Sequence, residues 1–541
     1  MASDKILSDV DGGLLPTLSD LTTLSTKLGL QWTDEELAVL EEMHKDVVRC
    51  LRRVEDVYPT AATPASDRYP RNPGFKPSPE ENPYNGWAWR CDIHGAAEGK
   101  LAGRTVGIKD NIAVAGIPMS VGTAMLREYL PDFDATVVTR ILDAGGRIMG
   151  KTTTEAMCLS GSSVTSCDGP VTNPWDVARI AGGSSSGSAA LVAGGIVDMA
   201  LGGDQGGSVR IPASCTGIVG MKPTFGLIPY TGAMAIDTSL DHIGVMATSV
   251  RDCALLLEVT AGYDKGRDTR QKVLATVPQF STLLEASLYG RKAALLKEGF
   301  DNCEEEDVKD LVEKVAAQLH HVGVSVTEAS VPLHQESAGM YTATCLQGAY
   351  YTMLKGGGAG YCDGGYHPVS LQEAMFRGLN SDLEKLPTVV KRYLIFGEFL
   401  ERSIGPSLRG KGRNLILALA DAYDSLLQEV DVLIMPTLPR KAAKIPPPGT
   451  PLQDIYRHTN SWSANTRSFN LTGHPAISVP VGRCVGPVTT RSCNMGDDQL
   501  PVGLMVVGRR YEDLTVLQVA HALEKLNREL NDSAMAASAT R

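Results

Sequence analysis

The chain reads GGSSSGS over residues 182–188 and GGDQGGSVR over residues 202–210, so two groups of serines lie among glycines. A serine nucleophile needs backbone N–H groups beside it to hold an oxyanion, and glycines let the backbone approach a substrate closely. Gly206-Gly207-Ser208 is a candidate nest of this kind. Glycine and serine are equally typical of surface loops, so the rest of the sequence must decide between a loop and a site for acyl chemistry.

The composition is that of a globular protein. The chain has 541 residues, of which 43% are apolar and 21% charged, which is enough for one large α/β domain with additions or for two to three ordinary domains. The formal net charge is −11 and no run of Lys and Arg matches a phosphate backbone. We therefore expect a small molecule as partner, and no nucleic acid.

The cysteines and the hydropathy indicate a cytoplasmic protein. The eleven cysteines are odd in number, spread along the chain and form no C-x-x-C pair, which argues against a disulfide framework and against a zinc site. No apolar segment opens the chain, and the weakly polar run 189–203 is interrupted by Asp198. We expect reduced thiols and no membrane association.

The N-terminal part of the sequence predicts a helical appendage. Thr33 and Glu36 form a capping-box pattern, and apolar residues at helical spacing follow until Pro59, where we expect the helix to end. Residues 59–83 include seven prolines, counting Pro59 and Pro83, a composition typical of an extended linker. We assign residues 1–60 to a helical extension, 61–83 to a Pro-rich linker, 84–530 to the main domain and 531–541 to a disordered tail.

The main domain alternates strand and helix patterns. A strand is predicted around 104–108 and a helix over 135–144, with Gly145 as its stop. The runs 430–436 and 475–481 are predicted to be buried strands, so the core continues almost to the C-terminus. This alternation predicts an α/β fold.

One pattern imitates a nucleotide site. Residues 145–152 read GGRIMGKT and match the phosphate-binding loop G-x-x-x-x-G-K-[ST], which needs a strand before it and a helix after it. Here a helix is predicted before Gly145, and Arg147-Ile148-Met149 is strand-like. We therefore predict a helix-to-strand turn in place of a nucleotide site.

A second pattern imitates the nucleophile elbow of Ser-His-Asp hydrolases. Residues 183–187 fit G-x-S-x-G with Ser185 in the middle, but the preceding segment 173–180 is too polar for a central strand. Such a site would also need a histidine base. The candidates in the sequence are His242, His367, His458 and His474.

Three segments resemble the catalytic segments of the amidase signature family. They are GIKDN at 107–111, GGSS at 182–185 and GGSVR at 206–210, with Ser184 lying 24 residues before Ser208. The resemblance continues through IPA, GIVGMKPT, MPT and PVGLM and covers about residues 84–530. Within the family, GDQGGS at 203–208 and the N-terminal extension are similar to bacterial amidases that accompany nitrile hydratases. Ser186 departs from the pattern, because the family usually has a second glycine there.

The resemblance implies a central mixed twisted β-sheet flanked by helices on both faces, with an N-terminal helical extension. It also implies a Ser-cisSer-Lys triad, in which Ser208 attacks, Ser184 relays the proton after a cis peptide at Gly183, and Lys109 accepts the proton. Lys109 must be neutral for this role, so burial should lower its pKa.

The same resemblance assigns the oxyanion hole to backbone N–H groups, those of Gln205, Gly206, Gly207 and Ser208. Ser185, Asp204 and Arg210 are implied as supporting residues, and an ion pair is expected between Asp204 and Arg210. The implied activity is hydrolysis of a small aliphatic or aromatic carboxamide through an acyl-enzyme, without cofactor or metal. We expect a homodimer.

Two other functions stay open at this stage. The glutaminase-type component of a tRNA amidotransferase resembles the same family, although the acidic charge and the N-terminal extension argue against it. A catalytically silent binding protein would share the fold but would not need all three triad positions. The acyl pocket cannot be assigned from the sequence, because loops form it.

Overall fold

The computed structural model describes residues 16–61, 68–273, 276–358, 365–381, 383–447, 449–451, 453–454, 462–485 and 499–539. The residue contacts divide the chain into two compact units, Met1–Ala65 and Ser66–Arg541. No helix in these ranges is long and apolar enough to cross a membrane.

The described residues of the first unit, 16–61, form the helices α3 (Leu18–Leu28) and α4 (Asp34–Ala61). The capping box predicted for α4 is present, because Glu36 N–H donates to Thr33 Oγ1 at 3.2 Å and Thr33 N–H donates to the Glu36 carboxylate at 2.8 Å. The helix runs to Ala61, two residues past the predicted end at Pro59. A proline in the last turn removes only one backbone donor, so the helix continues briefly beyond it.

Most of the predicted linker is part of the second unit. Residues 62–67 lie outside the described ranges, but Phe75 pairs with Arg90 through both backbone groups at 2.9 Å. Arg71 forms an ion pair with the largely buried Asp134. These contacts attach the proline-rich segment to the large unit, and its residues Pro79–Glu81 form a short 3-10 helix.

An eleven-stranded mixed sheet forms the centre of the second unit, in the order β1-β3-β2-β6-β8-β7-β12-β13-β11-β9-β10. β2 is parallel to β3 and β6, and β9 is parallel to β10 and β11, while the other pairs are antiparallel. The strands are β1 (Trp87–His94), β2 (Thr105–Lys109), β3 (Arg147–Thr152), β6 (Met199–Asp204), β7 (Val219–Lys222), β8 (His242–Ala247), β9 (Lys292–Leu296), β10 (Ser325–Ala329), β11 (Val432–Pro436), β12 (Ala476–Val485) and β13 (Gln499–Gly508).

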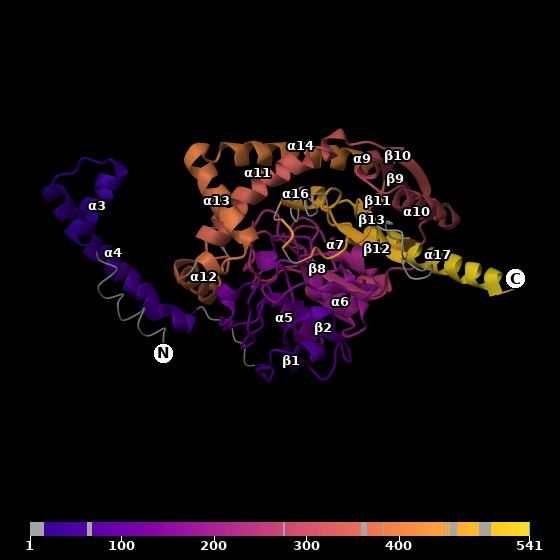
Figure 1. Cartoon of the computed structure of the whole chain (residues 1–541), viewed down its shortest axis with the longest axis horizontal. Helices are drawn as coiled ribbons and strands as arrows, with labels where there is room; N and C mark the ends of the chain where they lie inside the picture. Colours follow the sequence, from indigo (N-terminus) through magenta and orange to yellow (C-terminus); the bar gives the residue numbers. More distant parts are fainter. Residues whose placement is uncertain are drawn as a thin grey trace. The chain divides into compact units, whose positions relative to one another are not determined.

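Helices flank this sheet, so the predicted α/β class is confirmed. Every residue of β6, β8 and β11 is buried, as expected for strands covered on both faces. Helix α11 packs against α13 and α14 (Figure 1). The helices are α5 (Thr136–Asp143), α6 (Ser186–Ala193), α7 (Arg210–Thr216), α8 (Val250–Thr260), α9 (Lys297–Asp301), α10 (Glu306–Ala317), α11 (Ser337–Ala349), α12 (Val369–Ser381), α13 (Thr388–Ser403), α14 (Ser407–Glu429), α16 (Ser468–Leu471) and α17 (Asp513–Ala539).

The C-terminal segment differs from the predicted disordered tail. Helix α17 continues to Ala539, and only residues 540–541 lie outside the described ranges. The sequence of this segment is rich in alanine, which has the highest helix propensity, so composition favours continuation of the helix over fraying.

The phosphate-loop pattern is a helix-to-strand turn, as predicted. Helix α5 ends before Gly145, which has φ +83°, and β3 begins at Arg147. The lysine of the pattern, Lys151, is buried in β3 and donates to Asp110 Oδ1 at 3.0 Å. The charge of Lys151 is therefore paired with that of Asp110 inside the fold.

Candidate active site

Two neighbouring parallel strands bring the predicted site residues to one edge of the sheet. β2 ends at Lys109, and β6 ends at Asp204 before the loop that carries Ser208. Because parallel strands have their carboxyl ends at the same edge, Lys109 and this loop meet there.

Lys109 and Ser184 are in direct contact. Lys109 Nζ donates to Ser184 Oγ at 2.8 Å and to the Gly203 carbonyl at 3.1 Å, and both side chains are fully buried. Burial lowers the pKa of Lys109, although the Cys158 thiol and the Asp204 carboxylate nearby favour its charged form. The lysine thus lies in surroundings that favour the neutral amine.

The backbone around Ser184 is tightly held. The Gly183–Ser184 peptide bond is cis. The Ser184 carbonyl accepts hydrogen bonds from Thr154 Oγ1 at 2.9 Å and from Glu155 N–H at 3.3 Å. A Cβ on residue 183 would lie 2.9 Å from Glu155 Cγ, so glycine is the residue that fits there.

Ser208 is the serine that faces open space. It is 8% exposed and lines a cavity of about 780 Å³, together with Tyr341 and Trp462. Its carbonyl accepts the Ser185 N–H at 3.1 Å, which ties the two serine segments together. Within the described residues, Ser208 Oγ makes no hydrogen bond to Ser184 Oγ; contacts of this kind often form only when substrate is bound.

One of the four predicted oxyanion donors is used elsewhere. Gly207 N–H donates to Asp204 Oδ1 at 2.8 Å, so this group does not face the cavity as a free donor. The N–H groups of Gln205, Gly206 and Ser208 donate to no protein acceptor in the described ranges. The prediction of Gly207 is therefore corrected: its amide shapes the loop by binding the carboxylate three residues earlier.

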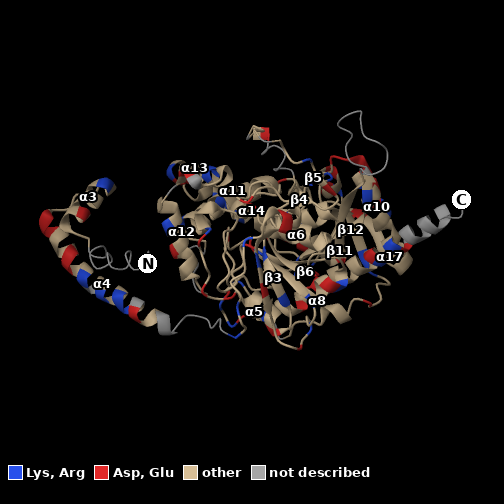
Figure 2. Cartoon of the chain, turned by 60° about the horizontal axis from the view of Figure 1, so that its bottom comes forward, with Lys and Arg blue, Asp and Glu red and all other residues tan. Residues whose placement is uncertain are grey.

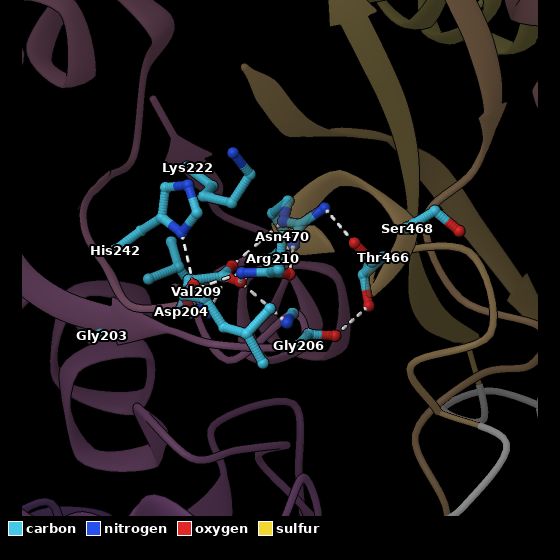
Figure 3. Close-up of polar contacts among 12 residues, drawn as sticks. Gly203, Asp204, Gly206, Val209, Arg210, Lys222, His242, Thr466, Ser468 and Asn470 are labelled. Atoms are coloured by element: carbon cyan, nitrogen blue, oxygen red, sulfur yellow. Dashed lines mark hydrogen bonds and ion pairs between the residues drawn. The ribbon is translucent and has the colours of Figure 1, made fainter. Parts of the chain in front are cut away.

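The expected ion pair between Asp204 and Arg210 forms beneath this loop (Figure 3). Arg210 Nη2 lies 2.9 Å from Asp204 Oδ1 and Arg210 Nε lies 3.0 Å from Asp204 Oδ2, with both side chains fully buried. Burial alone would raise the pKa of Asp204, but Arg210 outweighs it and holds that pKa well below its usual range.

Two residues that the sequence did not reveal complete this cluster (Figure 3). Thr466 Oγ1 donates to the Gly206 carbonyl at 2.6 Å, and Asn470 Nδ2 donates to the Asp204 carbonyl at 2.8 Å. Arg210 in turn donates to the Thr466 carbonyl at 2.9 Å and to Asn470 Oδ1 at 2.7 Å. The segment 466–470 therefore clamps the loop that presents Ser208.

The Ser185 elbow hypothesis is wrong. Ser185 Oγ is hydrogen-bonded to the backbone of Gly203 at 3.2 Å. The strand before it, β5 (Asp176–Ile180), pairs with the short β4 (Thr172–Asn173) and bridges to Lys444, outside the main sheet.

The three candidate histidines that the structure describes have other surroundings than Ser185. His242 bonds to the Leu240 carbonyl, and His474 bonds to Thr472 and Asp424. His367 lines a different pocket, and His458 lies outside the described ranges.

Ser186, which departs from the family pattern, is the first residue of α6, and its hydroxyl is buried without a hydrogen-bond partner among the described residues.

The described residues hold no group of three or more His, Cys, Asp or Glu side chains placed to bind a metal ion. What they do hold is a buried lysine–serine pair beside a cavity-facing serine, at the carboxyl edge of a mixed sheet. This is the arrangement that an α/β enzyme with a serine nucleophile and a lysine base would require.

The comparisons identify the family within that class. The model of the Amidase family matches residues 87–517, so the chain belongs to this family and is a hydrolase acting on carbon–nitrogen bonds. An enantioselective amidase of Rhodococcus rhodochrous is 40% identical, with 82% of this chain and 84% of the relative covered. The A component of the glutamyl-tRNA(Gln) amidotransferase of Methanosarcina mazei is 35% identical, with 79% and 85% covered. The structure of a peptide amidase from Stenotrophomonas maltophilia superimposes with a TM-score of 0.64 at 25% identity, with 80% and 84% covered.

Proposed function

We propose that Lys109, Ser184 and Ser208 form the catalytic triad of this amidase. The observation that carries the proposal is the buried 2.8 Å contact between Lys109 Nζ and Ser184 Oγ, next to a cavity that Ser208 lines. Lysine is a base only when neutral, and burial lowers the pKa of Lys109 in that direction.

In the proposed proton path, the step from Ser184 to Lys109 follows the observed contact, and the step from Ser208 to Ser184 uses a contact that forms when substrate is bound. Ser208 Oγ attacks the amide carbon while its proton passes to Ser184 Oγ, and the Ser184 proton passes to Lys109 Nζ. The leaving nitrogen takes a proton back along the same path, and ammonia or an amine departs from the acyl-enzyme. Water then attacks the Ser208 ester, with the relay as base, and frees the carboxylate.

The loop that carries Ser208 stabilises the tetrahedral oxyanion. We assign the donors to the N–H groups of Gln205, Gly206 and Ser208, and we assign Asp204 and Arg210 to holding their geometry. Loss of one oxyanion donor typically costs about 3 kcal/mol of barrier, so this loop accounts for a sizeable part of the rate.

The substrate proposed is a small aliphatic or aromatic carboxamide. Support comes from the size of the cavity, about 780 Å³, and from the higher identity to an amidase than to an amidotransferase component. A panel from acetamide through benzamide to anilides, read for ammonia and for amine, tests this directly. Ammonia release from glutamine that depends on added partner proteins would instead favour the amidotransferase function.

Two substitutions test the triad. Lys109→Ala and Ser208→Ala should each abolish amide hydrolysis in a protein that still folds, which circular dichroism and thermal melting can check. Retention of hydrolysis by either folded variant would contradict the proposed mechanism.

We further propose a homodimer formed by the first unit. Helix α4 exposes apolar side chains at helical spacing, which in water favours a partner surface; they are Val39, Met43, Val47, Leu51 and Val54. Light scattering should give twice the chain mass, and Val47→Glu should halve it. A monomeric wild-type protein would contradict this proposal.

Location and nucleic-acid binding are proposals of the same kind. Nine cysteines are described and all are free thiols, which supports a reducing compartment, and we propose the cytoplasm. Acidic and basic segments follow one another along α4 (Figure 2), which supports the absence of a nucleic-acid surface. Cell fractionation and a filter-binding assay with tRNA check the two proposals.

A further inference from the structure

The cavity in front of Ser208 carries positive charge only. Among its lining residues in the described part of the chain are two arginines, Arg392 and Arg467, but no aspartate or glutamate. This is unexpected in a chain whose formal net charge is −11. Glu155 is bonded to the lining residue Thr165 at 2.9 Å, and burial raises the pKa of this glutamate, which favours its neutral form.

Arg467 is held close to the nucleophile loop by its neighbours in the sequence. The preceding residue, Thr466, donates to the Gly206 carbonyl at 2.6 Å, and Arg467 N–H donates to the Ser463 carbonyl at 3.1 Å. Tyr341 also lines the cavity, and its hydroxyl would lie 2.7 Å from a Cβ placed on Gly206. Arg467 and the loop of Ser208 therefore border the same space.

The guanidinium of Arg467 has no protein partner in the described ranges. No hydrogen bond or ion pair involves its side chain, and its Nε is buried without an acceptor. Arg210 provides the contrast, because its guanidinium contacts Asp204, Asn470 and the Thr466 carbonyl. The Arg467 side chain is half-buried, and the partial desolvation of this unpaired cation lowers its pKa.

We propose that Arg467 binds a carboxylate on the substrate, so that the enzyme prefers amides that carry one negative charge. A planar guanidinium and a carboxylate match in two parallel hydrogen bonds, and a partner of this kind supplies the acceptors that the protein lacks. This inference rests on the proposed amidase function and names its substrate class.

The described residues that line the cavity include no acidic side chain, which narrows the proposed class of substrates further. A zwitterion such as glutamine also carries an ammonium group, and the described cavity wall offers no carboxylate to bind it. Monoamides of dicarboxylic acids, which have one carboxylate and one amide, fit the charge of the cavity better.

Kinetics with matched substrate pairs test the proposal. Adipic acid monoamide and hexanamide share a six-carbon chain and differ by the carboxylate, and succinic and glutaric acid monoamides vary the spacing. Wild type should have at least a tenfold higher kcat/KM for the best monoamide than for its neutral partner. Arg467→Gln should remove this preference through a higher KM for the monoamide, so that kcat/KM falls at least tenfold more for the monoamide than for hexanamide, and Arg467→Lys should retain part of the preference.

The matched control is Arg402→Gln, because Arg402 lies on α13 with a side chain that is 78% exposed. This variant should keep the wild-type preference. If Arg467→Gln loses kcat/KM equally for the monoamide and for hexanamide, the inference is overturned and a structural role is indicated. A wild type without preference for the monoamides would also overturn the inference.

Binding separates this inference from the proposed function. Adipic acid monoamide should bind the Ser208→Ala protein in calorimetry, and the Ser208→Ala/Arg467→Gln protein at least tenfold more weakly. If wild type hydrolyses no amide but this binding difference is found, the proposed function fails while the site of Arg467 stands. Equal affinity of the two proteins would overturn the carboxylate site, whatever the activity.

Discussion

Replacing Arg210 with methionine would leave the Asp204 carboxylate buried without its cation. In the wild type, Arg210 donates to the Asp204 carboxylate from Nη2 at 2.9 Å and from Nε at 3.0 Å, and this carboxylate is fully buried. In the variant the carboxylate keeps hydrogen bonds from the N–H groups of Gly207 and Val209, at 2.8 and 3.1 Å, and from the amide of Asn470 at 2.9 Å. Lys222 lies near enough to act on Asp204, but burial lowers the pKa of Lys222 and so favours its neutral amine. Three hydrogen bonds replace part of the hydration of a carboxylate but do not neutralise its charge.

The magnitude follows from the cost of an unpaired buried charge. Removing one partner of a buried ion pair typically costs about 3–5 kcal/mol, so we expect Arg210→Met to lower the free energy of unfolding by that amount at pH 8. The double variant Asp204→Asn/Arg210→Met leaves no charge behind, so it should be less destabilised than the sum of the two single variants by about 2 kcal/mol or more.

The effect should also depend on pH. Without Arg210, burial raises the folded-state pKa of Asp204 above its unfolded value, so the folded variant binds a proton more tightly and gains stability as the pH falls. The deficit relative to wild type should therefore be smaller at pH 5 than at pH 8.

Urea unfolding followed by tryptophan fluorescence measures these differences, with the wild-type slope applied to each midpoint. A cost below about 1 kcal/mol for Arg210→Met, or strict additivity in the double variant, would refute the view that this pair is the electrostatic anchor of the nucleophile loop.

Three further predictions concern catalysis and ligand specificity. The acid limb of kcat/KM should have unit slope and a pKa below the ordinary lysine value of 10.5, because burial lowers the pKa of Lys109 and only its neutral form accepts a proton; an acid limb whose pKa lies at or above 10.5 argues against this role. Gly207→Ala should lower kcat at least a hundredfold, since a Cβ there would lie 2.2 Å from Thr466 Oγ1 at φ +131°, whereas Gly410→Ala on α14, with no atom within 4 Å of the new Cβ, should behave as wild type. ATP and GTP at millimolar concentration should leave the melting temperature unchanged, because Lys151 is paired with Asp110 inside the fold; an upward shift would restore the phosphate-loop hypothesis.

Local features of the fold could be predicted because local chemistry determines them. The capping box at Thr33, the turn at Gly145 and the strand ending at Lys109 each depend on neighbours within a few positions. The predictions differ from the structure where long-range contacts or local composition determine the conformation. Residues 68–83 are attached to the large unit by contacts with Arg90 and Asp134, which lie outside the segment. Helix α17 continues to Ala539, where the sequence analysis predicted a disordered tail.

The site residues also fall into two groups, those that a local sequence pattern marks and those that only long-range contacts bring to the site. Ser184, Ser208 and Arg210 lie in one short stretch with a distinctive pattern, and Lys109 is found through its own motif. Thr466 and Asn470 reach the loop from more than 250 positions away, as Arg467 reaches the cavity, and no local pattern marks them. The hydrogen bond from Gly207 N–H to the Asp204 carboxylate depends on the orientation of the Asp204 side chain, which the spacing of residues in the sequence does not determine.

The most direct test of the mechanism is to locate the acyl group on the enzyme. A p-nitrophenyl ester of a short carboxylic acid serves as the acylating probe, and cleavage before Asp204 separates Ser208 from Ser184 and Ser185 for mass spectrometry. We predict one acyl group on the peptide that contains Ser208, formed in wild type and at least a hundredfold more slowly in Lys109→Ala. Acylation of Ser184 or Ser185, or labelling of Ser208 at an unchanged rate without Lys109, would contradict the assignment of Ser208 as nucleophile and Lys109 as its base.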